Sequence, residues 1–213
     1  VIDRHGQLRW RPLEVDTPLH KDHWFFSSKP DFASSLKTVD ELMANWESSV
    51  GHGGQLMLGI APDTRGLLPD ADVRRLAEFG KALKARYGDG ANLAATHAPT
   101  DANTAAALDN DRTTFWSAPA GSANAALEVD LGREVTFDRA MSMEWLDDGQ
   151  NVHGYAVQVW DGNGWKTVAQ AQAIGHMKID RFPPVTARKV RLVIRSAVGT
   201  ARIRELKLFQ VGV

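Results

Sequence analysis

The sequence predicts two kinds of structure in succession: parallel α/β units over residues 1–88 and an antiparallel β-sandwich over residues 89–213. Residues 53–73 have the pattern of a buried strand, a Pro/Asp/Gly loop and a helix. Such a βα unit requires parallel neighbours. Gly88, expected to cap the last helix, marks the break. Beyond it, short alternating apolar runs separated by Gly-, Asn- and Asp-rich turns replace the helical patterns, which indicates all-β structure.

Two helices and one clear strand are expected in the first region. Thr38 and Glu41 form a T-x-x-E capping box ahead of an apolar stripe, which predicts a helix. The apolar run at 55–60 predicts a buried strand, and a second helix is expected to begin near Pro69. The aromatic run at 24–26 is expected to form a further strand. This alternation is typical of the closing units of a (β/α)8-like barrel or a doubly wound sheet.

The second region contains several short strands at near-regular spacing, which is typical of an antiparallel sandwich. The tetrapeptide Asp-Gly-Asn-Gly at 161–164 predicts a hairpin turn between two of them. The expected strands are residues 126–131, 140–145, 155–160, 165–169, 189–195 and 205–211.

Composition sets mild limits on function. The apolar fraction of 43% and the charged fraction of 24% are those of a globular protein. A net charge of −1 gives no electrostatic reason to expect a nucleic-acid partner, and no apolar run approaches the roughly 20 residues that span a bilayer, so no membrane insertion is expected. The absence of cysteine excludes disulfides and thiolate metal sites.

Four ordered motifs in the second region resemble the discoidin or coagulation-factor C-type fold, which family 32 carbohydrate-binding modules share. The motifs are ALDNDRTTFW at 107–116, LEVDLG at 127–132, ARKVRL at 187–192 and IREL at 203–206. The resemblance covers about 120 residues and implies a jelly-roll-like sandwich, often with a structural calcium ion.

The resemblance implies that Asp109, Asp111 and Thr114 hold this calcium together with Glu205, which opens the last strand. Calcium prefers several hard oxygen ligands, including backbone carbonyls that a tight loop supplies. The alternative is an Asx-turn beside an unrelated glutamate.

Sugar binding by the sandwich is a separate expectation. Such modules usually bind through loops at one end, with an aromatic platform and a few polar groups. Trp145 and His153, which flank one predicted loop, are the candidate residues here. In the alternative interpretation, Trp145 packs at the edge of the sandwich and the domain only braces its neighbour. The fold by itself does not decide between them.

The first region resembles the later part of the α-L-fucosidases of glycoside hydrolase family 29. The resemblance rests on WRPLEVD at 10–16, HWFF at 23–26, KTVDEL at 37–42 and the block GGQLMLGIAPDTRGLLPDADVRRLAEFG at 53–80. Two positions depart from the family pattern GGNLLLN, because Gln55 and Gly59 replace asparagines.

The resemblance implies a (β/α)8-like barrel with its active site at the carboxyl ends of the strands, so the loop at 61–68 is expected to border the pocket. It also implies retention of configuration, with a nucleophilic aspartate and a separate acid/base carboxyl. Glu14 matches the acid/base position, although a loop glutamate is usually only solvent-exposed. Trp10 and Trp24 are expected to give it apolar surroundings, and Asp16 to support the site.

The nucleophile is expected on preceding residues outside these 213. The main hypothesis is therefore the C-terminal fragment of a retaining exo-α-L-fucosidase, leaning towards α1,3/4 linkages and inactive alone. Its partners are fucosylated glycans and the N-terminal remainder of the enzyme. No cofactor is expected for catalysis, and secretion or periplasmic export is expected by analogy. The competing hypothesis is a non-catalytic carbohydrate-binding module with a scaffold remnant.

Overall fold

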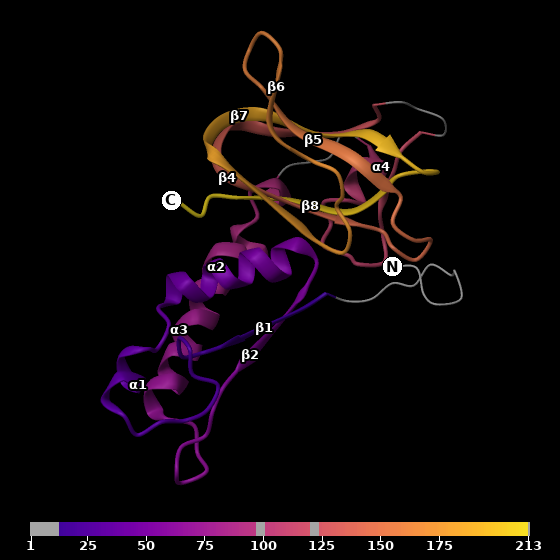
Figure 1. The fold of residues 1–213 in the computed structure, drawn as a ribbon. Coiled ribbons are helices and arrows are strands. Elements are labelled where there is room, and N and C mark those ends of the chain that lie inside the picture. The colour runs from indigo at the N-terminus through magenta and orange to yellow at the C-terminus, as the bar shows by residue number, and fades with distance from the viewer. Residues whose placement is uncertain (1–12, 97–100, 120–123, 213) are drawn as a thin grey trace, which may run out of the picture. The chain divides into compact units, whose positions relative to one another are not determined.

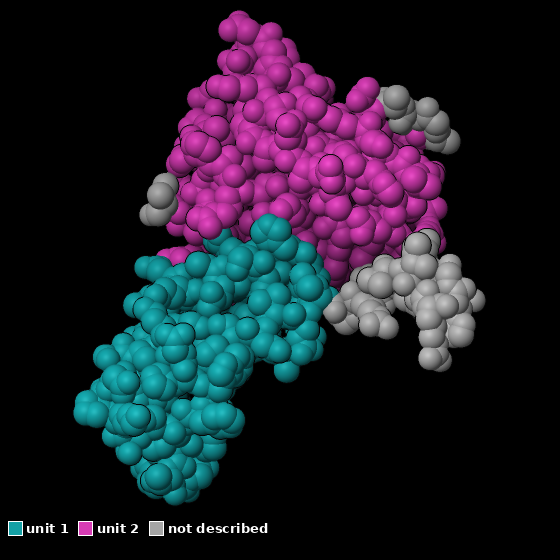
Figure 2. Space-filling model, viewed as in Figure 1, with its two compact units in different colours: residues 1–82 teal, residues 83–213 magenta. Residues whose placement is uncertain are grey.

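The computed structural model describes residues 13–96, 101–119 and 124–212. The chain divides into two compact units, residues 1–82 and residues 83–213 (Figure 2). In the described ranges, no helix is both long enough and apolar enough to cross a membrane.

Unit 1 contains a two-stranded parallel sheet with helices around it. Its regular elements are β1 (Glu14–Pro18), α1 (Pro30–Ser34), α2 (Val39–Ser49), β2 (Gln55–Gly59) and α3 (Asp70–Tyr87), which continues past residue 82. The register pairs Glu14 with Gln55 and Pro18 with Gly59, so the two carboxyl ends lie side by side. This parallel pairing is the one that the βα pattern predicts.

The prediction of a strand at 24–26 was wrong. That segment belongs to a loop whose only ladder contacts are isolated bridges, from His20 to His23 and to Leu36. Its aromatic side chains are partly exposed and Phe26 contacts Phe32 edge to face, with ring centroids 5.2 Å apart. Aromatic composition alone therefore did not distinguish a strand from a loop that packs by its rings.

Local signals fixed the start of α2. The Thr38 hydroxyl accepts a hydrogen bond from the Glu41 amide at 3.2 Å, and the Glu41 carboxylate accepts one from the Thr38 amide at 2.9 Å. This reciprocal pair satisfies two amide groups that a helix start leaves unpaired. Leu42 and Met43 follow on the buried face, so the predicted capping box and apolar stripe are confirmed.

Gly88 follows α3 as predicted, but for a different physical reason. Its φ of −66° is an ordinary value rather than the left-handed one of a glycine C-cap. A Cβ at this position would lie 2.4 Å from the carbonyl oxygen of Lys84. Glycine is therefore required here because the backbone approaches the end of the helix closely.

A buried side-chain cluster ties the chain after β1 to the start of α3. His20 Nε2 lies 3.0 Å from Asp72 Oδ1, and His20 Nδ1 lies 2.9 Å from the carbonyl oxygen of Phe32. The imidazole stacks on the Phe32 ring at a centroid distance of 3.8 Å. Asp72, in the first turn of α3, is 1% exposed and lies within hydrogen-bond distance of a residue 52 positions earlier.

We expect Asp72→Ala to weaken this cluster by about 1–3 kcal/mol, because it leaves the buried His20 Nε2 without its partner. Asp70→Ala is the matched control, since Asp70 lies in the same helical turn but is exposed. Amide hydrogen exchange across α2 and α3 measures the local opening free energy of both variants. Equal losses of opening free energy in the two variants would show that Asp72 stabilises the unit only through the helix dipole.

Unit 2 is built around one six-stranded antiparallel sheet with the order β3-β8-β4-β7-β5-β6. Two 3₁₀ turns (Asp89–Ala91 and Leu93–Thr96) and the short helix α4 (Ala102–Ala105) precede it. The strands are β3 (Trp116–Ser117), β4 (Ala126–Glu144), β5 (Val152–Trp160), β6 (Trp165–Ala171), β7 (Lys178–Ala197) and β8 (Arg202–Phe209).

The two long strands fold the sheet over a single core. β4 pairs with β7 along most of its length and with β8 near its end, and its register shifts between Asp130 and Val135. Figure 1 shows the sheet curling in this way. β5 and β8 accordingly supply Val157 and Leu206 to the same buried cluster. The predicted sandwich is confirmed, although 126–131 and 140–145 form one strand rather than two.

Candidate functional sites

One face of the β1–β2 sheet carries the polar residues of the candidate active site. Along a strand, alternate side chains point to opposite faces. Glu14 and Asp16 are exposed, as are their register partners Gln55 and Met57, whereas the intervening residues are half-buried. α2 packs on β2, which places the polar residues on the face opposite this helix. In a barrel, the face opposite the helices is the interior.

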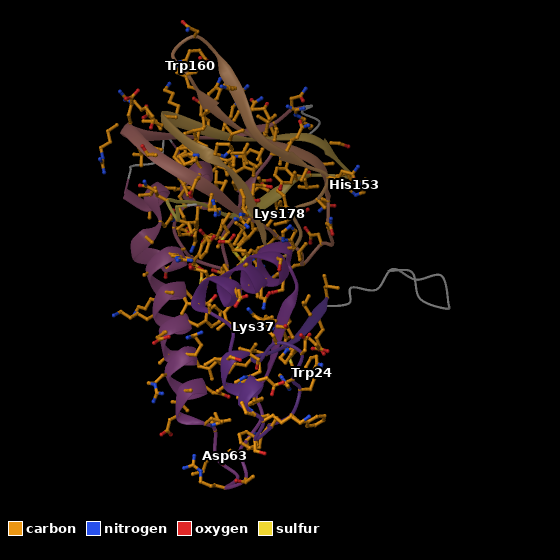
Figure 3. All side chains as sticks on the ribbon, turned by 60° about the vertical axis from the view of Figure 1, so that its left-hand side comes forward. Trp24, Lys37, Asp63, His153, Trp160 and Lys178 are labelled. Atoms are coloured by element: carbon orange, nitrogen blue, oxygen red, sulfur yellow. The ribbon has the colours of Figure 1, made fainter. Side chains whose placement is uncertain are left out.

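Trp24 lies at the carboxyl end of β2. A Cβ built on Gly59 would lie 3.0 Å from the Trp24 ring, so glycine lets the indole approach the strand. Trp24 is 51% exposed (Figure 3). The lack of a side chain at Gly59 thus leaves the space that the Trp24 ring occupies.

The structure does not bring Trp24 and Glu14 together. Trp24 contacts the last residue of β2, while Glu14 is the first residue of β1 and pairs with the first residue of β2. Four strand steps of about 3.3 Å separate these ends, or roughly 13 Å. Trp24 therefore does not supply the apolar surroundings expected for Glu14, and Trp10 lies outside the described residues.

Lys37 binds the carboxyl end of β1, and Asp63 organises the loop that follows β2. Lys37 Nζ donates to the Thr17 hydroxyl at 2.5 Å and to the Pro18 carbonyl, and burial lowers the pKa of this amine. In the loop after β2, Asp63 accepts hydrogen bonds from the Arg65 amide at 2.8 Å and from its guanidinium at 2.6 Å. These bonds hold the pKa of Asp63 below its usual value and fix the loop (Figure 3).

The predicted calcium loop gathers several acceptor oxygens around one hydroxyl group. The Thr114 hydroxyl lies 2.9 and 3.0 Å from the two Asp109 carboxylate oxygens, 3.0 Å from the Asp111 carbonyl and 3.3 Å from the Ala106 carbonyl. A hydroxyl donates only one hydrogen bond. The Asp111 amide also donates to Asp109 Oδ1 at 2.8 Å, and the Thr114 amide to the Asp111 carbonyl at 3.3 Å. Asn110, with a φ of 62°, turns the backbone so that these oxygens converge.

Glu205, on β8, lies close enough to this loop for the charge of Asp109 to act on it. It is 2% exposed, and neither carboxylate oxygen has a hydrogen-bond partner. Burial raises its pKa to about 7, while the charge of Lys207 acts to lower the pKa and that of Asp109 to raise it. The Leu206 amide, next along β8, donates to the Ala107 carbonyl at 2.8 Å, which holds the strand against the loop. A buried, unpaired carboxylate is costly unless a cation or proton compensates it.

This arrangement fits a calcium ion in its donor chemistry, since carboxylate, carbonyl and hydroxyl oxygens are the ligands calcium prefers. In the described part of the chain, no three His, Cys, Asp or Glu side chains converge as a metal cluster. The Asp111 carboxylate, a predicted ligand, accepts hydrogen bonds from the Thr113 amide at 2.8 Å and the Thr113 hydroxyl at 2.7 Å. A cation here would therefore rely on backbone and hydroxyl oxygens in addition to Asp109 and Glu205.

The candidate sugar-binding residues of the sandwich are not displayed as a free platform. The half-buried Trp145 packs against Phe115 with ring centroids 4.7 Å apart, and the Arg204 guanidinium lies 4.8 Å over it. His153 is exposed on β5 (Figure 3). Sugar binding by Trp145 and His153 stays a prediction, and the contacts of Trp145 are those expected of a packing residue.

A cavity of about 330 Å³ opens elsewhere, between residues 118, 119, 124 and 125 on one side and the segment 194–201 on the other. Its described lining mixes backbone with small polar side chains, among them Asn124, Ser196 and Thr200. Neither Trp145 nor His153 lines it. No sequence motif indicated this cavity, because residues about 70 positions apart form it.

The chain matches two protein-family profiles, one in each region. Residues 92–206 match the profile of the F5/8 type C domain, and residues 3–89 match that of the alpha-L-fucosidases. A putative alpha-L-fucosidase 1 of Oryza sativa subsp. japonica is 25% identical over 207 residues, covering 92% of this chain and 38% of that protein.

Solved structures of fucosidases resemble this chain over most of its length. A putative alpha-L-fucosidase from Bacteroides thetaiotaomicron matches with a TM-score of 0.82 at 27% identity, over 92% of this chain and 44% of that one. A Ruminococcus gnavus GH29 fucosidase in complex with fucose gives 0.82 at 25% identity, over 95% and 42%. The chain thus spans about two fifths of the length of these relatives.

The parallel βα units and the discoidin-type sandwich thus correspond to two successive family profiles. The chain belongs to the F5/8 type C family through residues 92–206, and the region before it is the C-terminal part of a family 29 α-L-fucosidase domain.

Proposed function

We propose that this chain is part of a longer exo-α-L-fucosidase that removes terminal α-L-fucosyl residues from glycans with retention of configuration. The observation that carries the proposal is the exposed β1–β2 face with Glu14 and Asp16. In a protein matching the fucosidase profile, this face corresponds to a barrel interior. Carboxyl groups are the residues that glycoside hydrolysis uses.

Glu14 is the proposed general acid/base, on the strength of the W-x-P-x-E-x-D motif at 10–16. Its role is to protonate the leaving oxygen and then to activate water. Motif and geometry point to different carboxyls, because barrel active sites lie at the carboxyl ends of strands and Glu14 begins β1. Asp16, two residues nearer that end on the same face, is the alternative.

The nucleophile is proposed to lie in the remainder of the longer enzyme. Double displacement needs two carboxyl groups about 5–5.5 Å apart, on opposite sides of the glycosidic bond. Only two of a barrel's eight strands are among the described residues of unit 1. We also propose that fucosylated glycans with α1,3/4 linkages are the preferred substrates and that the enzyme acts outside the cytoplasm, as fits glycan degradation.

Hydrolysis of 4-nitrophenyl α-L-fucoside by the longer enzyme tests the activity. We expect fucose release there and none from the 213-residue chain alone. Proton NMR of the first product should show the α-anomer, and fucose should leave α1,3/4-linked trisaccharides faster than α1,2-linked ones. No release from any α-L-fucoside by the longer enzyme would refute the proposal.

We further propose that the sandwich holds a structural calcium ion between the 106–114 loop and β8. Two observations support it: four acceptor oxygens surround the single Thr114 hydroxyl, and Glu205 has two buried, unpaired oxygens. When bound, calcium neutralises carboxylates that otherwise repel each other. Its role is to fix the loop against the strand, and no catalytic step involves it.

A further inference from the structure

The β5–β6 hairpin carries a pair of tryptophans that the proposed fucosidase activity does not use. Val157 and Val159 point into the core, so Gln158 and Trp160 lie on the outer face of the sheet. Trp160 pairs in register with Trp165, and their rings meet edge to face with centroids 5.6 Å apart. Trp160 is 38% exposed at the end of the hairpin (Figure 3).

An arginine from the neighbouring strand is fixed beside this pair. The Arg191 guanidinium lies 4.2 Å from the centroid of the Trp165 ring. Arg191 Nε donates to Gln158 Oε1 at 2.8 Å, and Gln158 Nε2 donates to Thr167 Oγ1 at 3.0 Å. Side chains from β5, β6 and β7 thus hold the guanidinium in place before any ligand arrives, which lowers the entropy cost of binding.

Arg191 forms no ion pair within 4.0 Å among the described residues, where its bonded partner is an amide oxygen. Arg188, on the same strand, differs because it bonds both oxygens of Asp130, at 2.8 and 3.1 Å. Glu128 lies opposite Arg191 in the β4–β7 register, but its ion pair is with Lys189 at 4.0 Å. An oriented guanidinium beside an exposed indole is therefore available to an anion.

We propose that this outer face, defined by Trp160, Trp165 and Arg191, binds an anionic saccharide chain. The apolar face of a pyranose ring packs on an indole, and a guanidinium matches the paired oxygens of a carboxylate or sulfate. The exposed Arg195, also on β7, adds a second positive charge beside Thr167. The proposal is independent of the fucosidase activity, because no catalytic candidate lies in this unit.

Calorimetric titration of the whole chain with oligogalacturonate tests the proposal. The methyl ester of the same oligosaccharide is the neutral control, and a chondroitin sulfate oligosaccharide distinguishes sulfate from carboxylate as the preferred anion. We expect at least tenfold tighter binding of an anionic chain than of the ester, weakening as salt rises. Trp160→Ala should reduce this affinity at least tenfold.

Arg191→Gln should remove the preference for the charged chain, whereas Arg188→Gln, the matched control on the same strand, should leave affinity unchanged. The proposal is overturned if neither anion binds at millimolar concentration, if acid and ester bind equally, or if Trp160→Ala binds as the wild type does. Self-association that Trp160→Ala abolishes, without saccharide binding, would instead assign this face to a second copy of the chain.

Discussion

Glu14→Gln, introduced into the longer enzyme, is expected to lower the rate of fucose release from an unactivated oligosaccharide by about 10²–10⁴-fold, the usual contribution of general acid catalysis. A nitrophenolate leaves without protonation, so cleavage of 4-nitrophenyl α-L-fucoside should slow far less. Glutamine keeps the shape of the side chain but has no proton to transfer. The ratio of the two rate losses is therefore the diagnostic quantity.

Asp16→Asn is the matched variant, because Asp16 lies on the same exposed face two residues nearer the carboxyl end of β1. If Glu14 is the acid/base, Asp16→Asn should affect both substrates equally. The opposite pattern, in which only Asp16→Asn shows the leaving-group dependence, transfers the role to Asp16. Equal losses on both substrates in Glu14→Gln would remove Glu14 from the role.

The parts of this fold that could be predicted depend on residues close together in the sequence. The Thr38–Glu41 capping box is a three-residue spacing, and it forms as expected. The 161–164 turn likewise fixes the β5–β6 register, with Gly162 at a φ of 98°. Short-range hydrogen bonds and allowed φ values determine such features, so a single sequence contains the information.

The parts that the sequence did not predict depend on distant residues. Gly132 resembles a turn residue between two strands, yet at a φ of 70° it sits within the irregular part of the continuous strand β4. β7 pairs across this irregularity, which local sequence does not reveal. The His20–Asp72 contact joins residues 52 positions apart. Tertiary packing, rather than propensity, determined both.

In the candidate sites, too, motifs predicted some features and only the fold determined others. The motif at 107–116 predicted a calcium loop; oxygens do lie around Thr114, and the calcium ion itself stays a prediction. What the motif left open was the state of Glu205, whose burial only the fold of β8 determines. Similarly, Trp24 was expected beside Glu14, whereas Trp24 lies against Gly59, at the other end of the β1–β2 ladder from Glu14.

Calcium is expected to stabilise the sandwich, and Glu205→Gln is expected to remove that stabilisation. A ligand at one hundred times its dissociation constant adds about 2.7 kcal/mol to the free energy of unfolding. The wild-type melting temperature should therefore rise by several degrees on addition of calcium and fall again with chelator. Glutamine at position 205 removes the negative charge that binds the ion, so its melting temperature should be insensitive to calcium.

The difference in stability between Glu205→Gln and the wild type should change sign between chelator and calcium. In chelator, Glu205→Gln should equal or exceed the wild type in stability, because a neutral amide is cheaper to bury than an unpaired carboxylate. In calcium, the wild type should be the more stable protein. Glu128→Gln, a change of the same kind at a position 46% exposed, should respond to calcium as the wild type does. An equal calcium response in Glu205→Gln and wild type would place the ion elsewhere, and no response in either would leave the Thr114 oxygen cluster without a cation.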